Sequence, residues 1–157
     1  MKTIKNYVFF WDGWLSNFYP CKIVFNNKVF CSSEQLFMYL KATFFKDYDI
    51  ANQILKAKTP KEAKKLGRKI KDFEEEAWKE VREEKMEQTI KAKFDQNPEL
   101  KSLLLSSDFD GKTFVEASPY DRIWGIGFAE DFAMANLNSW GLNLLGNIIT
   151  QYRENHK

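Results

Sequence analysis

A carboxylate and an ammonium group stand seven residues apart in a stretch that is otherwise almost wholly apolar. Residues 32–44 predict a buried helix, and at about 100° per residue Glu34 and Lys41 share one face of it, roughly 10 Å apart along the axis. Charged groups on a buried helix must be paired, exposed at an edge or lining a cleft. Glu34 could stabilise a cation or hold hydroxyl groups. The alternatives are that Glu34 only complements the helix dipole and that Lys41 extends to solvent.

A second group of polar and aromatic residues follows a predicted strand at residues 112–117. Glu116 lies at the end of that strand, Asp121 lies in a turn, and Trp124 precedes Gly125-Ile126-Gly127. Strand ends and the loops after them often carry function, and the indole could stack on a ring. The two glycines indicate a position where the backbone needs conformational freedom or where another group approaches it closely. They do not form a dinucleotide-binding fingerprint. The alternative is a core tryptophan with turn-forming acids.

Three further segments hold candidate binding residues. In the loop at 15–20, Asn17 could bind an amide or a sugar hydroxyl, and Phe18 or Tyr19 could stack on a ring. The alternative is a turn whose aromatic residues are buried in the core. Asn143 could cap the last helix, whose free N–H groups would attract phosphate; an ordinary helix start is the alternative. The basic runs at 56–71 and 79–93 are interleaved with acids and predict solvated faces, with Arg68 as the one candidate for a phosphate contact.

The composition narrows the class of protein. The 157 residues are 44% hydrophobic and 16% aromatic, which predicts one folded domain spanning residues 1–157. The net charge of +2 argues against a dedicated nucleic-acid or membrane binder. One histidine and two cysteines cannot form the usual four-ligand zinc site, so we expect neither metal nor cofactor. Cys21 and Cys31 are expected to be free thiols, which favours a cytoplasmic location.

Short strands and helices are expected to position these residues. Asn26-Asn27 separates two β-rich runs and predicts a hairpin, and Ser32 and Gln35 have the spacing of a helix capping box. Pro60 after Thr59 predicts another helix start. The sequence as a whole predicts an α+β fold, mostly helical with a few short strands. The expected strands are 7–11, 22–25, 28–30 and 112–117, and the expected helices are 32–44, 49–56, 59–67, 73–94, 97–105 and 142–153.

Six segments in one order resemble the NADAR family, also known as the YbiA-like or swarming-motility-protein-like family. The resemblance covers about residues 8 to 154. Gln35 stands where some relatives carry histidine, and the stretch between Gly127 and Gly141 is longer than in the shortest relatives. The six segments are Leu15-Ser16-Asn17-Phe18, Ser33-Glu34-Gln35 with Lys41, Ala63-Lys64-Lys65-Leu66-Gly67-Arg68, Trp78 with Met86 and Lys93-Phe94, Val115-Glu116 with Asp121 and Trp124-Gly125-Ile126-Gly127, and Gly141-Leu142-Asn143-Leu144-Leu145-Gly146.

The resemblance implies an N-glycosidase that cleaves the bond between ribose and a base or amine. The implied substrates are riboflavin-pathway ribosylamino-pyrimidine phosphates and ADP-ribosylated guanine, either as a free nucleotide-like molecule or in nucleic acid. Glu34, Asp121 and Lys41 are the expected catalytic residues. The expected substrate-binding residues are Asn17, Phe18, Arg68, Trp78, Glu116, Trp124, Gly125 and Asn143.

Glycosidic cleavage passes through an oxocarbenium-like state and commonly uses two acidic groups. We expect Glu34 or Asp121 to stabilise the cation and orient water while the other relays a proton. Lys41 would place a cation or proton donor beside the leaving group, or would attack the sugar carbon as an amine. A non-catalytic module that binds NAD or ADP-ribose is the alternative function.

Overall fold

In a computed structural model that describes residues 1–157, the chain forms seven α-helices, two short 3-10 helices and five short strands. This confirms the expected mixed, mostly helical class. The chain divides into two compact units, here named the terminal unit (Met1–Ser16 and Glu99–Lys157) and the central unit (Asn17–Pro98). Organisation as one domain over residues 1–157 stays a prediction. None of the helices combines the length and apolar character needed to cross a membrane.

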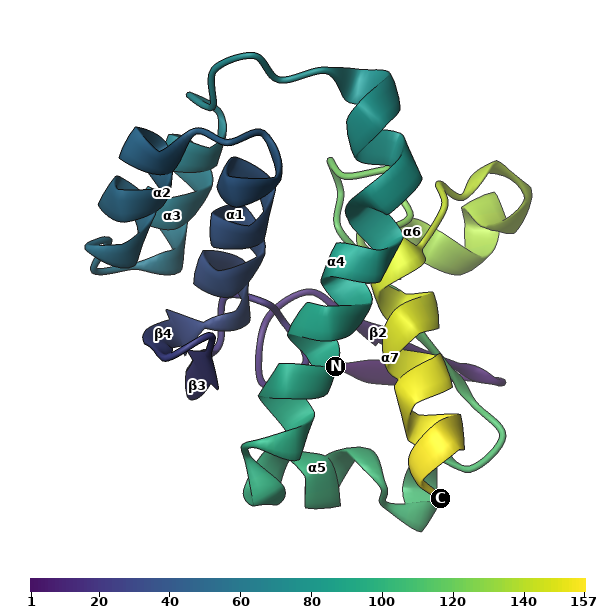
Figure 1. The fold of residues 1–157 in the computed structure, drawn as a ribbon. Helices are drawn as coiled ribbons and strands as arrows, with labels where there is room; N and C mark the ends of the chain where they lie inside the picture. The colour runs from purple at the N-terminus through teal and green to yellow at the C-terminus, as the bar shows by residue number, and fades with distance from the viewer. The chain divides into compact units, whose positions relative to one another are not determined.

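A three-stranded sheet in the order β1-β2-β5 forms the base of the terminal unit. The strand β2 pairs antiparallel with β1 and parallel with β5, with Phe10 opposite Glu116. The last helix, α7, lies against β5 (Figure 1). The elements of this unit, with α5 starting at its boundary, are β1 (Lys2–Ile4), β2 (Tyr7–Phe10), α5 (Pro98–Leu104), η1 (Ser107–Phe109), β5 (Thr113–Glu116), α6 (Glu130–Ala133), η2 (Met134–Ser139) and α7 (Leu144–His156).

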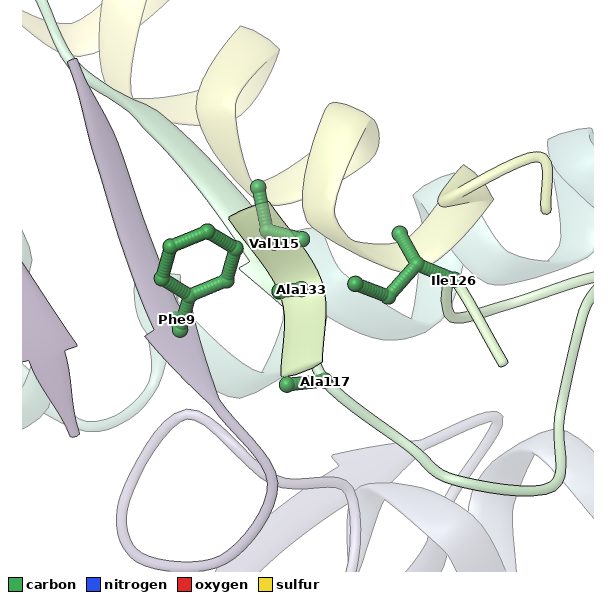
Figure 2. Packing of buried hydrophobic residues seen from close by; sticks show 5 residues of the cluster. All are labelled: Phe9, Val115, Ala117, Ile126 and Ala133. Atoms are coloured by element: carbon green, nitrogen blue, oxygen red, sulfur yellow. The ribbon is translucent and has the colours of Figure 1, made fainter. Parts of the chain in front are cut away.

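Buried side chains from the sheet and from the segments after β5 form the core of the terminal unit. Figure 2 shows five of them, namely Phe9, Val115, Ala117, Ile126 and Ala133. Trp140 closes one side: its ring meets Phe9 edge-on at 5.8 Å between centroids, and its Nε1 donates to the carbonyl of Ala133 at 2.8 Å. This core holds the segment 117–133, which carries several candidate site residues, against the sheet.

Arg153 anchors the end of α7 and is fully buried. Its Nε donates to the carbonyl of Leu104 at 3.0 Å, one of its terminal nitrogens donates to the carbonyl of Ser106 at 3.1 Å, and it pairs with Asp110. Its other terminal nitrogen donates to Glu154 at 3.4 Å, so every nitrogen of this buried cation has an acceptor, and the arginine joins α7 to the segment that follows α5.

Replacing Arg153 with methionine is expected to lower the free energy of unfolding by about 2–4 kcal/mol, because buried carbonyls lose their donors. Urea denaturation of the wild-type protein and of Arg153→Met measures the change. Gln151→Met, a change to methionine at an exposed position of the same helix, is the control and should change stability little. A loss no larger than that of the control would contradict the anchoring role.

The central unit contains a β-hairpin followed by four helices. Asn26 and Asn27 both adopt positive φ (50° and 63°), as a two-residue hairpin turn requires, so the predicted hairpin is confirmed. The helices α1, α2 and α3 lie side by side (Figure 1), and α4 also packs on α1. The elements of this unit are β3 (Pro20–Phe25), β4 (Lys28–Ser32), α1 (Ser33–Phe44), α2 (Tyr48–Leu55), α3 (Pro60–Gly67) and α4 (Glu75–Asp95).

The predicted cap, Ser32, immediately precedes α1, although half of the expected capping box differs. The Ser32 hydroxyl accepts from the N–H of Gln35 at 3.1 Å, as expected. The Gln35 Oε1 accepts at 2.8 Å from the N–H of Cys31 rather than from that of Ser32. Its Nε2 donates to the carbonyl of Ile54 at 2.9 Å, so this buried amide joins the start of α1 to the end of α2. Gln35 is therefore a structural link beside Glu34.

Lys93 is a fully buried lysine on α4. Burial lowers the pKa of its ammonium group to about 8, although the charge of Cys21 acts in the opposite direction. An unfolded lysine has a pKa near 10.4. Below about pH 8 Lys93 is charged in the folded protein, which therefore carries the full cost of a buried cation. Between about pH 8 and 10.4 the free energy of unfolding rises with pH, because the unfolded chain still binds the proton and the folded protein does not.

Lys93→Met is accordingly expected to raise the free energy of unfolding by about 1–3 kcal/mol at pH 7 and by much less at pH 10. Chemical denaturation at both pH values measures the gain. Lys79→Met, at an exposed position of the same helix, serves as the control and should have little effect at either pH. A gain that does not shrink with pH would count against the buried ammonium as its source.

Candidate active site

Glu34 occupies the second position of α1 in the central unit, and its side chain is only 8% exposed. Its backbone N–H donates to the carbonyl of Asn17 at 3.0 Å. The Ser33 hydroxyl donates to the side-chain Oδ1 of Asn17 at 2.9 Å. The loop that contains Asn17 thus holds the first turn of α1 in place, and Glu34 is fixed at a helix end whose dipole favours a carboxylate.

Lys41 lies two turns further along α1 in an aromatic environment. Its Nζ is 4.7 Å from the ring centroid of Phe73 and 5.7 Å from that of Trp78. Trp78 is itself buried and packs against Phe37 at 5.6 Å between centroids, and also against Phe44 and Phe45. Cation–π contacts of this kind attract the ammonium form of the side chain to the ring faces.

Burial is the main influence on the pKa of Lys41, which lies below the ordinary lysine value. The charges of Glu34 and Glu75 raise this pKa, and the charge of Arg68 lowers it. Four of the predicted site residues therefore interact within the central unit: Glu34, Lys41, Arg68 and Trp78. The lowered pKa increases the fraction of Lys41 that is a neutral, nucleophilic amine near neutral pH.

Asn17 and Phe18 differ in how much they offer to a ligand. Asn17 is buried, and its side-chain amide is engaged at both ends, since Oδ1 accepts from Ser33 and Nδ2 donates to the Met86 sulfur at 3.5 Å. Phe18 is 39% exposed, and its ring lies 5.8 Å from the Nζ of Lys64 on α3. Asn17 thus positions α1, whereas Phe18 is partly exposed beside Lys64.

Asp121 shapes the turn that carries Trp124 in the terminal unit. Its Oδ1 accepts from the N–H groups of Ile123 and Trp124, both at 2.8 Å, and its own N–H donates to the Ser118 hydroxyl at 3.1 Å. The predicted turn is confirmed. The other carboxylate oxygen, Oδ2, has no hydrogen bond within the chain, so one oxygen builds the turn and the other remains available to a ligand.

The backbone around Glu116 depends on close approach at a glycine, as the sequence predicts. The carbonyl of Glu116 accepts from Ile126 at 3.0 Å, and a Cβ atom on Gly125 would lie only 2.7 Å from that carbonyl oxygen. Gly146 fits equally closely, since its Cβ would lie 2.2 Å from the carbonyl oxygen of Phe114. Both glycines therefore let a second segment pack directly against β5.

Asn143 does not cap α7 through its side chain, which corrects that expectation. Its Oδ1 accepts from the N–H of Glu116, and its Nδ2 donates to the carbonyl of Phe114, both at 3.0 Å. The N–H groups of Leu144 and Leu145 are not free either, because each donates to a carbonyl of the 123–124 segment at 3.1 Å. Asn143 therefore fastens α7 to β5, and a role for it in binding substrate stays a prediction.

The candidate residues thus form two groups, each built within one unit. The central unit holds Asn17, Phe18, Glu34, Lys41, Arg68 and Trp78, and the terminal unit holds Glu116, Asp121, Trp124, Gly125 and Asn143. The action of both groups on one substrate stays a prediction. No group of three or more His, Cys, Asp or Glu side chains is arranged to hold a metal ion.

Sequence reasoning missed Phe73 and Glu75 beside Lys41, and also Arg82. Arg82 is 8% exposed and lies four residues after Trp78 and four before Met86. This spacing places it on the same helix face as Trp78 and Met86, which the sequence analysis had singled out. That position was the available signal, although in the sequence alone Arg82 reads as one charge among many on a solvated helix.

The family model described as the NADAR domain matches residues 9–156. The chain belongs to the NADAR family. A solved structure, the NMR structure of the Escherichia coli protein YbiA, is similar to this NADAR protein with a TM-score of 0.78 and 27% sequence identity, over 98% of this chain and 87% of that one.

Curated proteins are also similar to this NADAR chain. Protein irg-1 of Caenorhabditis elegans is 40% identical over 80% of this chain, which spans 60% of that protein's length. N-glycosidase R617 of Acanthamoeba polyphaga mimivirus is 36% identical over 82% of this chain and 75% of its own length. Riboflavin biosynthesis protein VVA0006 of Vibrio vulnificus is 32% identical over 90% of this chain but only 35% of its own length.

Proposed function

We propose that this NADAR protein is an N-glycosidase, a hydrolase that cleaves the N-glycosidic bond between ribose and a base or amine. The main observation behind this proposal is the group of Glu34, Lys41 and Trp78, where an amine of lowered pKa lies over an aromatic ring and interacts with the charge of a helix-end carboxylate. Membership of a family whose relatives include a protein named N-glycosidase supports the same activity.

The chemistry requires charge stabilisation at the sugar and at the leaving group. Glu34 or Asp121 would stabilise the oxocarbenium-like sugar and orient the attacking water, while the other acid relays a proton. Lys41 would act at the leaving group or attack the sugar carbon. Phe18 and Trp124 would stack on the base, and stacking of this kind is worth about 1–3 kcal/mol per base. Arg68, Trp78, Asn17, Glu116, Gly125 and Asn143 would complete or position the pocket.

The proposed substrates are phosphorylated ribosylamino-pyrimidines of riboflavin synthesis and ADP-ribosylated guanine. The similarity to a protein named for riboflavin biosynthesis favours the first class. The free thiols of Cys21 and Cys31 fit the cytoplasmic location that we propose for the reaction.

Incubation of the purified protein with each substrate class tests the proposal. We expect chromatography to reveal free base together with the free sugar phosphate or ADP-ribose. Tight binding of either molecule without release of base would overturn the enzymatic proposal and favour a non-catalytic module that binds NAD or ADP-ribose.

A further inference from the structure

Arg82 is a buried cation whose guanidinium has no acceptor in the chain. The residue is only 8% exposed, its Nε is inaccessible to solvent, and it makes no hydrogen bond or ion pair. Arginine is almost never buried without a partner, because removing its charge from water is costly unless another group replaces the lost solvation. A residue of this kind therefore needs a specific reason to be where it is.

Arg153 illustrates how this protein buries an arginine for structural purposes. That side chain has two carbonyl acceptors and two carboxylate partners. Arg82 has no equivalent set of acceptors, although both residues lie on long helices. The difference indicates that the acceptor for Arg82 is supplied from outside the chain.

The position of Arg82 relates it to the candidate site within the central unit. One turn before it, Trp78 meets Lys41 and Phe37 of α1. One turn after it, the Met86 sulfur accepts from Asn17, whose carbonyl in turn holds the N–H of Glu34. The i, i+4 spacing therefore places Arg82 on the face of α4 that carries Trp78 and Met86, between the contact of this helix with α1 and its contact with the loop that contains Asn17.

We propose that Arg82 binds a phosphate group of the substrate. The planar guanidinium stays charged at every working pH and presents a rigid set of donors that matches two oxygens of a phosphate. The inference rests on the proposed function for the identity of the ligand, since a ribosyl substrate brings either a 5′-phosphate or the diphosphate of ADP-ribose. Arg82 would then be the buried phosphate contact, whereas Arg68, which is exposed at the end of α3, mainly adjusts the charge of Lys41.

Isothermal titration calorimetry with ribose, ribose 5-phosphate and ADP-ribose tests this assignment. The wild-type protein is expected to bind at least one of the phosphorylated compounds about 10- to 100-fold more tightly than ribose. Arg82→Met should remove that preference, and Arg82→Lys should keep part of it through its point charge. Lys79→Met, which removes an exposed charge from the same helix, should leave the preference unchanged.

The two phosphorylated ligands separate the two sources of phosphate. Loss of affinity for ribose 5-phosphate in Arg82→Met indicates a 5′-phosphate, and a loss confined to ADP-ribose indicates the diphosphate. Thermal melting of the same variants checks their folding, and Arg82→Lys provides the measurement if the methionine variant does not fold. A wild-type protein without a preference for phosphorylated sugar, or Arg82 variants that retain the full wild-type preference, would overturn the proposal.

Binding of these sugars requires no turnover, so this result is independent of the hydrolysis assay. A phosphate preference that depends on Arg82, without release of base from any substrate, would reject the N-glycosidase proposal and support this one. Release of base, together with a phosphate preference that is unchanged in the Arg82 variants, would support the N-glycosidase proposal and reject this one.

Discussion

Glu34→Gln is expected to lower turnover by about 10²- to 10⁴-fold, the usual contribution of a general acid–base or charge-stabilising group. Glutamine keeps the shape of the side chain and can remain in the first turn of α1, but it cannot carry the negative charge that stabilises an oxocarbenium-like sugar. Steady-state assays of base release measure the loss, and circular dichroism checks the fold.

Glu76 provides a matched control for this variant. It occupies the second position of α4, as Glu34 does in α1, but it is exposed. Glu76→Gln therefore makes the same chemical change at the same place in a helix and should retain wild-type turnover. Equal turnover in the two variants would exclude a catalytic role for Glu34.

Asp121→Asn tests the second acid in the same assay. Asparagine can still accept from the N–H groups of Ile123 and Trp124 through its Oδ1, so the turn should survive while the charge is lost. A comparable fall in turnover is expected, with the exposed Asp108→Asn as the control. Full activity in both Glu34→Gln and Asp121→Asn would reject the two-carboxylate mechanism.

The sequence predicted the start of α3 and the hairpin turn correctly, because a few adjacent residues determine each of them. The Thr59-Pro60 pair fixes the start of α3, where the Thr59 hydroxyl accepts from the N–H of Glu62 at 3.1 Å. The Asn26-Asn27 pair fixes the hairpin turn. In both cases a few adjacent residues determine the backbone angles, so a single sequence is sufficient.

Features that depend on distant partners were not predictable in this way. The parallel pairing of β2 with β5 joins strands that are separated in sequence by the whole central unit, and no local pattern encodes it. The strand β1 has only three residues, which is too short to show the alternation of apolar and polar residues that indicates a strand. The sequence suggested that Asn143 caps the helix that follows it, because its actual partners on β5 are far away in the sequence. The burial of Arg82 depends on packing between helices, which the charged sequence around it does not indicate.

Among the candidate catalytic residues, Lys41 is the one whose surroundings in the structure differ most from what the sequence alone indicates. The sequence offers an ordinary lysine, whereas the structure places its amine over two aromatic rings with a lowered pKa. An amine of this kind can attack the sugar carbon as the base departs with a proton. Opening of the sugar ring then leaves an imine that water hydrolyses or borohydride reduces.

Borohydride treatment during turnover is therefore expected to leave a stable sugar adduct on Lys41, located by peptide mass spectrometry. The yield should rise with pH through the pKa of Lys41, below the ordinary lysine range, because only the neutral amine attacks. Arg68→Gln removes a charge that lowers this pKa and should shift the profile to higher pH, and Glu75→Gln should shift it to lower pH.

Lys41→Met should give no adduct, whereas Lys69→Met, at an exposed position, should behave as the wild-type protein does. Absence of any adduct, together with retained activity in Lys41→Arg, would assign Lys41 an electrostatic role in place of the covalent one.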